Sequence, residues 1–118
     1  MEFELLKSRF AVCVLDKPEL PQGEFVSLTI SNGEISLVCE EEKAPRARKT
    51  EKGWRALRVK GPLDFTLVGI MAHISSVLAD AGISLFAVST YETDYVLVKE
   101  ENIIRTIEAL KEKGHTVL

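Results

Sequence analysis

Two segments in the second half of the chain repeat their apolar residues at helical spacing, and short apolar runs flank both of them. The stripe of the first segment, at steps of three and four, consists of Leu67, Ile70, Met71, Ile74, Val77, Leu78 and Ala81. The second segment begins near Asn102, and its stripe consists of Ile103, Ile104, Ile107 and Leu110. A stripe of this width predicts an amphipathic helix with one face in a core. Gly82 and Gly114 follow the two segments, where helices commonly end.

The apolar runs around these helices predict strands. They are residues 54–60, 83–89, 95–99 and 115–118. Strand, helix, strand, strand, helix, strand is the order of the ferredoxin-like βαββαβ sandwich, in which two helices cover one face of a sheet. The sequence therefore predicts an α+β fold, with this sandwich over residues 54–118.

The first half of the chain has a strand pattern and no long helical period. Residues 10–15 form one apolar run, and residues 25–30 and 35–39 predict a hairpin around Ser31-Asn32-Gly33. Residues 40–53 are mostly polar and predict a surface connection. We expect residues 1–53 to form a strand-rich half that packs with residues 54–118 as one cooperative unit.

Charge and length limit the classes of partner. The 118 residues carry a net charge of −3 with a pI near 5.4, which gives no long-range attraction to nucleic acid or anionic lipid. Residues 43–60 hold eight cations against the single acid Glu51. The aromatic interleaving of single-strand binders is missing there, so a solvated loop is favoured. We see no cationic leader and no run of eighteen apolar residues, and expect a cytoplasmic protein without membrane or nucleic-acid partners.

Catalytic signatures are missing from the sequence. It has no phosphate-binding glycine loop, no Gly-x-Ser-x-Gly elbow and no closely spaced set of His and Cys. Cys13 and Cys39 lie in apolar runs and are expected to be buried thiols. His73 and His115 have no visible acid or nucleophile partner and are expected to be ordinary surface residues. We therefore predict no catalytic residue, no metal and no cofactor.

Two polar places are candidates for binding. Residues 61–69 join a strand to a helix, and the first N–H groups of that helix suit a carboxylate. Asp64 or Thr66 is the expected cap of the helix. Gly69 is expected in the first turn, where it leaves room for a ligand. Residues 89–94 form a turn with several hydroxyls, and its Asp94 suits an ammonium group. The alternatives are a plain cap, a glycine that allows close packing, and a turn acid bonded to its own backbone.

The βαββαβ order brings these two places to the same edge of the sheet. One place offers N–H groups to an anion, and the other offers a carboxylate and hydroxyls to a cation. Together they complement a zwitterionic amino acid. Because neither place supplies a poised acid and base, binding is favoured over catalysis.

Residues 51–65 and 89–98 also resemble a known family. Both stretches are similar to small prokaryotic ACT-domain proteins related to the ACT repeats of the CASTOR arginine sensors, and residues 10–13 and 36–41 resemble that family's first half. The resemblance implies two ACT-like units, 1–53 and 54–118, with an amino acid held where units meet, and it implies a homodimer. The contacts it implies are Phe65, Thr66, Leu67, Val68 and Gly69 in the loop, and Thr90, Tyr91 and Asp94, beside Ser89, in the turn.

These observations predict a non-catalytic module that binds an amino acid or another small zwitterion and serves in regulation or sensing. Three alternatives stay open. They are a structural dimerisation module without a ligand, a small enzyme of ferredoxin-like fold, and a nucleic-acid binder that uses residues 43–60.

Overall fold

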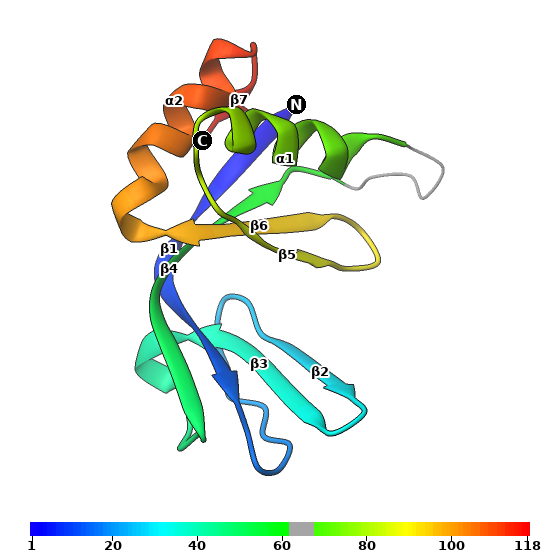
Figure 1. Ribbon diagram of the computed structural model, residues 1–118, viewed down its shortest axis with the longest axis vertical. Coiled ribbons are helices and arrows are strands. Elements are labelled where there is room, and N and C mark those ends of the chain that lie inside the picture. Colours follow the sequence, from blue (N-terminus) through cyan, green and yellow to red (C-terminus); the bar gives the residue numbers. More distant parts are fainter. Residues whose placement is uncertain (62–67) are drawn as a thin grey trace. The chain divides into compact units, whose positions relative to one another are not determined.

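The computed structural model describes residues 1–61 and 68–118 of the chain (Figure 1). The strands are β1 (Glu2–Val14), β2 (Ser27–Ser31), β3 (Glu34–Glu40), β4 (Lys49–Val59), β5 (Phe86–Ser89), β6 (Asp94–Lys99) and β7 (Thr116–Val117). The helices are α1 (Ile70–Asp80) and α2 (Ile103–Glu112), with short 3-10 helices η1 (Glu41–Lys43) and η2 (Glu100–Asn102). The predicted α+β class is confirmed.

The chain divides into two compact units, which we name by their content. The helical unit consists of Met1–Leu6 and Arg55–Leu118, and the strand unit consists of Lys7–Trp54. The strands β1 and β4 each begin in one unit and end in the other. The predicted division into two ACT-like halves, 1–53 and 54–118, stays a prediction.

In the helical unit the chain order β4, α1, β5, β6, α2, β7 is the predicted βαββαβ order. The strands lie in the order β5-β6-β4-β1, and β7 pairs in parallel with the start of β1, where Glu2 faces Thr116 and Phe3 faces Val117. Residues 49–53, predicted as a surface connection, instead belong to β4. The prediction failed there because strand pairing uses backbone groups, which polar side chains leave available.

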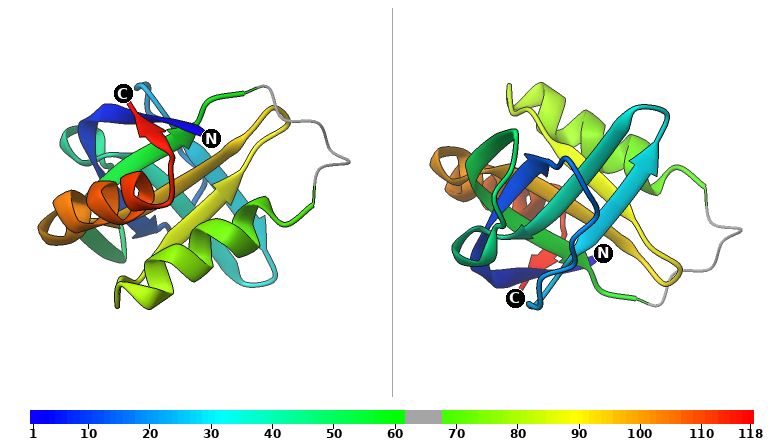
Figure 2. Two further views of the ribbon diagram at one scale, coloured as in Figure 1. Left: turned by 90° about the horizontal axis from the view of Figure 1, so that it is seen from above. Right: turned by 90° about the horizontal axis from the view of Figure 1, so that it is seen from below.

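The core of the helical unit lies between its strands and its two helices. Figure 2 shows α1 and α2 side by side over one face of these strands. Buried side chains from every layer meet there: Phe3, Leu57, Val59, Ile74, Val77, Leu78, Ile83, Val96, Val98, Ile103 and Leu110. The described residues of the two predicted stripes face this core, except for Ile104, which is 71% exposed because it lies on the outer side of α2; Leu67 lies outside the described residues.

The two helices differ in how well their starts were predicted. The helix α2 begins at Ile103, directly after η2 and within a residue of the expected position. The helix α1 begins at Ile70, and Gly69 precedes it with φ 81°. Gly69 is therefore not in the first turn as predicted, because its left-handed backbone ends the loop before the helix begins.

In the strand unit, β2 and β3 form the predicted hairpin. Ser31 faces Glu34 in its register, and Gly33 takes φ 77° in the two-residue turn. The strand β3 also pairs with β1, with Cys13 opposite Leu37. Residues 7–54, all of which the structure describes, contain η1 but no α-helix. One cluster in the core of this unit consists of Ala11, Cys13, Leu15, Leu37 and Cys39 with partly buried neighbours. Phe10, Phe25 and Val38 are also buried in this unit, and the rings of Phe10 and Phe25 lie edge to face.

Candidate functional site

The predicted binding turn joins β5 to β6 in the helical unit. Ser89 and Asp94 are the last cross-strand pair before the turn, and the Ser89 hydroxyl donates a hydrogen bond of 2.5 Å to Asp94 Oδ1. Inside the turn, Thr90 N–H donates to the Thr93 carbonyl at 2.8 Å. The turn is therefore closed by its own hydrogen bonds, and Asp94 keeps a fixed place at its base.

Thr93 connects this turn to the end of β4. Its side chain is buried, and its Oγ1 donates a hydrogen bond of 2.5 Å to the carbonyl oxygen of Val59. Val59 is the last residue of β4 and lies just before the segment in which the loop contacts were predicted. Thr93 is not among the contacts predicted from the sequence, although it belongs to the predicted turn, and its buried hydroxyl needs a hydrogen-bond partner.

The chemistry of the turn suits a cation with hydrogen-bond donors. Asp94 is half-buried, and its carboxylate can accept further hydrogen bonds besides the one from Ser89. The Tyr91 side chain is 81% exposed at the tip of the turn. An ammonium or guanidinium group beside Asp94 would form a charge-assisted hydrogen bond, which is stronger than a neutral one.

The second predicted place is described only at its end. Val68 is 90% exposed, and the Gly69 carbonyl accepts a hydrogen bond of 2.9 Å from His73 N–H in the first turn of α1. The predicted contacts Phe65, Thr66 and Leu67, and the predicted cap at Thr66 or Asp64, lie outside the described residues. The expected approach of this loop to the turn therefore stays a prediction.

The basic segment 43–60 is neutralised locally by carboxylates. At least five of its eight cations form ion pairs: Lys43 with Glu40 at 3.7 Å, Arg48 with Asp16 at 2.7 Å, Arg55 with Glu100 at 3.8 Å, Arg58 with Glu4 at 3.7 Å, and Lys60 with Glu2 at 3.3 Å. Each carboxylate lowers the local potential that a phosphate backbone would experience. The segment is therefore less positive as a surface than its sequence indicates.

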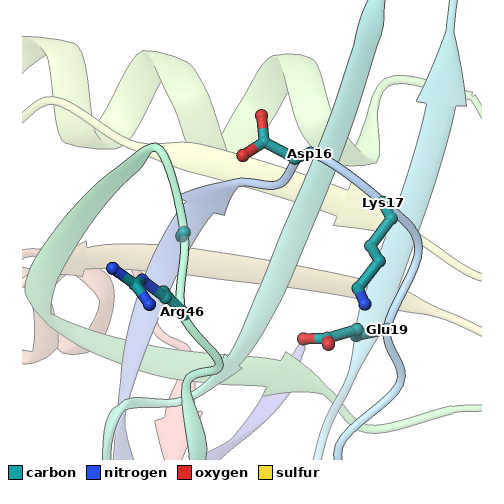
Figure 3. Close-up of a pocket in the computed structure, with 5 residues that line it drawn as sticks. Asp16, Lys17, Glu19 and Arg46 are labelled. Carbon is teal, nitrogen blue, oxygen red and sulfur yellow. The ribbon is translucent and has the colours of Figure 1, made fainter.

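An open cavity of about 530 Å³ lies in the strand unit (Figure 3). Its lining residues are Asp16, Lys17, Glu19, Arg46 and Ala47. None of the predicted contacts lines it, and Ala47 is its one apolar side chain. Small-molecule sites are usually more enclosed. The cavity therefore does not replace the turn as the candidate site.

The two histidines are neighbours, which the sequence did not predict. His73 Nε2 and His115 Nε2 lie 2.7 Å apart, and His115 Nδ1 lies 2.7 Å from the amino nitrogen of Met1. Burial, with the positive amino group and His73, lowers the pKa of His115 below 6.5. No sequence signal could have found this pair, because 42 residues separate the two rings.

The two cysteines are free and buried, as expected. Burial and the neighbouring Cys13 raise the pKa of the Cys39 thiol to about 11. Within residues 1–61 and 68–118, no three or more His, Cys, Asp or Glu side chains gather in a way that would hold a metal ion. In the same described part of the chain, no helix is long and apolar enough to cross a membrane.

Comparison with known families identifies the class of protein. Residues 49–112 match the ACT domain, which is more than half of the chain. The chain therefore belongs to the ACT-domain family. The match spans β4 to the end of α2, which is most of the βαββαβ sequence described above.

Among curated proteins, the chain is similar to the cytosolic arginine sensor for mTORC1 subunit 1. It is 33% identical to the Homo sapiens protein in an alignment of 104 positions that covers 81% of this chain and 32% of that protein. For the Bos taurus protein the identity is 33% in an alignment of 97 positions that covers 75% of this chain and 30% of that protein. The chain thus spans about a third of the length of these relatives.

Among solved structures, the chain is similar to protein Atu0741 from Agobacterium tumefaciens, with 29% identity and a TM-score of 0.90 over 99% of this chain and 91% of that one. VC0802 from Vibrio cholerae, described as a possible transport protein, has 23% identity and a TM-score of 0.76 over 92% and 85% of the two chains. Aspartate kinase from Synechocystis has 18% identity and a TM-score of 0.67 over 99% of this chain and 27% of the kinase chain. The last two likenesses concern the fold alone.

Proposed function

We propose that this chain binds a free amino acid and acts as a regulatory or sensing module without catalysis. The observation that carries the proposal is the turn at residues 89–94, in which Asp94 is fixed by Ser89 and anchored through Thr93 to the end of β4. In the proposed complex, Asp94 accepts hydrogen bonds from the ligand's ammonium group. Thr90 and Tyr91 line the ligand from the same turn.

The loop that follows β4 supplies the second half of the proposed site. Its members are Phe65, Thr66, Leu67, Val68 and Gly69, whose backbone N–H groups would receive the ligand's carboxylate. The bond from Thr93 to the Val59 carbonyl supports this pairing, because it fixes the strand from which the loop departs. A fixed departure point reduces the conformational freedom lost on binding.

Family membership supports an amino acid as the ligand class. The curated relatives are named as arginine sensors, so L-arginine is the first ligand to test. The guanidinium group of arginine offers five donors for carboxylate and carbonyl oxygens. We extend the same proposal to location and assembly: a cytosolic protein with two ACT-like halves, 1–53 and 54–118, that forms a homodimer in which the second copy completes the site.

A ligand-free dimerisation module is the main competing function. It explains the fold and the family equally well, but it gives no role to a carboxylate held at the base of an exposed turn. Binding of nucleic acid has less support, because carboxylates pair with five cations of the basic segment. A small enzyme has less support as well, because the described turn pairs its carboxylate with a hydroxyl and with no second titratable group.

A thermal-shift screen with the twenty amino acids, followed by calorimetry of each hit, tests the proposal. A ligand at a hundred times its Kd should raise the free energy of unfolding by about 2.7 kcal/mol. The Asp94→Asn variant should lose this stabilisation, because its amide keeps an acceptor for Ser89 but has no charge for the ammonium group.

Glu92→Gln is the matched control. Glu92 is an exposed acid of the same turn, and its loss changes the net charge by the same amount. We expect this variant to bind as the parent chain does. Failure of all twenty amino acids would favour the ligand-free module, and equal binding by Asp94→Asn would refute the proposed site.

A further inference from the structure

The chain has two histidines, and the fold brings both rings to one place in the helical unit. His73 lies in the first turn of α1, and His115 lies between α2 and β7. Their Nε2 atoms are 2.7 Å apart, with ring centroids 4.9 Å apart and planes at 70°. In this arrangement one ring donates its N–H to the lone pair of the other.

Neighbouring groups hold the His115 ring in its position. The Met1 amino nitrogen lies 2.7 Å from His115 Nδ1. The His115 and Phe3 rings pack in a T-shaped arrangement, with centroids 5.7 Å apart and planes at 81°. Phe3 is fully buried in the core of the helical unit. The Nε2 atom of His115 therefore points toward His73 without needing a new rotamer.

We propose that His73 and His115 together bind a divalent transition-metal ion of the Zn²⁺, Ni²⁺ or Cu²⁺ type through their Nε2 atoms. Neutral imidazole is a preferred ligand of these ions, whereas Mg²⁺ and Ca²⁺ prefer oxygen. A metal–nitrogen bond of about 2.0–2.1 Å places two ligands of a tetrahedral ion about 3.3 Å apart. The two nitrogens, now 2.7 Å apart, would have to separate by roughly 0.6 Å.

The ion replaces one hydrogen atom of the present pair. When Nε2 of each neutral ring ligates a metal, the ring hydrogen must lie on Nδ1. In His115 that hydrogen would face the Met1 amino group, which now donates to Nδ1 as an ammonium, so binding of the ion requires the amino group to release one proton and accept the Nδ1 hydrogen. The two imidazole nitrogens therefore determine which ions bind, and they favour transition metals over Mg²⁺ and Ca²⁺.

Water completes the coordination in this proposal. In the described residues no third His, Cys, Asp or Glu joins the pair to form a larger set of ligands. His73 is exposed and His115 is half-buried, so water reaches the site. The bound ion would link the start of α1 to the segment before β7, and it would add stability because it binds only where both rings meet.

Titration of the full-length chain, without added histidines, with ZnCl₂ and NiCl₂ tests the proposal. Imidazole resonances in ¹H–¹³C and ¹H–¹⁵N spectra identify the ligating ring nitrogens. We expect Zn²⁺ to shift the Nε2 resonances of both rings, Ni²⁺ to broaden both, and MgCl₂ to change neither. His73→Gln and His115→Gln should each weaken Zn²⁺ binding at least about tenfold, since even outer-shell partners have effects of this size.

Asp80→Asn is the matched control, because Asp80 is an exposed residue at the other end of α1. This variant should bind Zn²⁺ as the parent chain does. The proposal fails if Zn²⁺ leaves the imidazole resonances unchanged, if it shifts one ring alone, or if Mg²⁺ produces the same changes. The parent spectra decide the matter even where a histidine variant folds poorly. Loss of amino-acid binding by Asp94→Asn has no bearing on this outcome.

Discussion

The helical unit and the strand unit have similar connectivity but build their cores in different ways. In the helical unit, β4, β5, β6 and β7 are interrupted by α1 and α2, and large aliphatic side chains fill the space between helices and strands. In the strand unit, β1, β2, β3 and β4 follow each other without an α-helix, and the buried side chains, among them Phe10, Phe25 and Leu37, come from strands and loops alone.

The difference shows why the candidate site belongs to the helical unit. A helix start exposes N–H groups without intrahelical partners, and these groups suit a carboxylate. Residues 7–54 have no α-helix that could supply them. The strand unit keeps the hairpin and the buried thiols, and it shares β1 and β4 with its neighbour. We therefore infer that it supports the fold while the helical unit carries the chemistry.

Truncation of one leucine in each core tests this contrast in stability. Leu78 and Leu37 are both fully buried, in the helical and strand units respectively. Leu78→Ala should lower the free energy of unfolding by about 4 kcal/mol, because large neighbours on rigid elements leave a cavity. Leu37→Ala should lower it by about 2.5 kcal/mol, because the cluster around Leu37 includes small side chains such as Ala11, Cys13 and Cys39, so the truncation loses fewer contacts. Urea unfolding followed by circular dichroism measures both values.

Because β1 and β4 run through both units, each leucine variant should still unfold in one transition. A second transition in either variant would mean that the units unfold separately. A larger loss for Leu37→Ala than for Leu78→Ala would contradict the assignment of the main core to the helical unit.

Thiol labelling tests whether the core of the strand unit is closed. Cys13 and Cys39 are fully buried, and the pKa of Cys39 rises from 9.0 to about 11. At pH 8 the thiolate fraction of Cys39 is then about a hundredfold lower than in the unfolded chain, and only the thiolate reacts. We expect iodoacetamide to label native Cys39 at least about a hundredfold more slowly, as measured by mass spectrometry. Labelling at the unfolded rate would show an open core.

Periodicity predicted the elements that are regular and local. The stripe of α2 and the Asn32-Gly33 turn depend on neighbours within a few residues, and the structure has both where they were expected. The turn at residues 89–94 was recognised for the same reason, because its hydroxyls and acids interrupt apolar strands. Its internal bonds join residues at most five positions apart.

Contacts between distant segments could not be predicted in this way. Residues 49–53 extend β4 because of their strand partners, although their side chains resemble those of a loop. Arg58 meets Glu4, and His73 meets His115, across separations that no spacing rule connects. Gly69 was recognised as a special residue, but only the backbone angle shows that it precedes the helix.

Replacement of the Thr93 hydroxyl by a methyl group tests how firmly the turn is anchored in the helical unit. Thr93→Val keeps the side-chain shape but leaves the buried Val59 carbonyl without the 2.5 Å hydrogen bond. We expect the free energy of unfolding to fall by about 1 to 2 kcal/mol. Thr29→Val is the control, since Thr29 is an exposed threonine of β2 outside the turn, and this variant should stay within about 0.5 kcal/mol of the parent chain. Equal effects in urea unfolding would mean that the turn has no buried anchor.

The smallest expected effect is a pH dependence that arises from His115 in the helical unit. The pKa of His115 lies below 6.5 in the folded chain, so the folded chain binds this proton less tightly than the unfolded chain does. The contribution of the neutral His115 ring to the free energy of unfolding is therefore complete above pH 6.5, and it is lost as the pH falls below 6.5. His115→Gln should lose less stability than the parent chain between roughly pH 7.5 and pH 5, a range in which most carboxylates stay ionised.

Two measurements separate this effect from other titrations. Urea unfolding of both chains at the two pH values gives the difference, and an NMR titration of the His115 ring gives its midpoint directly. The groups that face the ring are His73, the Met1 amino group and Phe3, so burial and positive charge both act in the same direction. A midpoint above 6.5 would mean that a group favouring the protonated ring outweighs the burial and the positive charge. The neutral form of the two rings, on which the proposed metal site depends, would then be less populated near neutral pH.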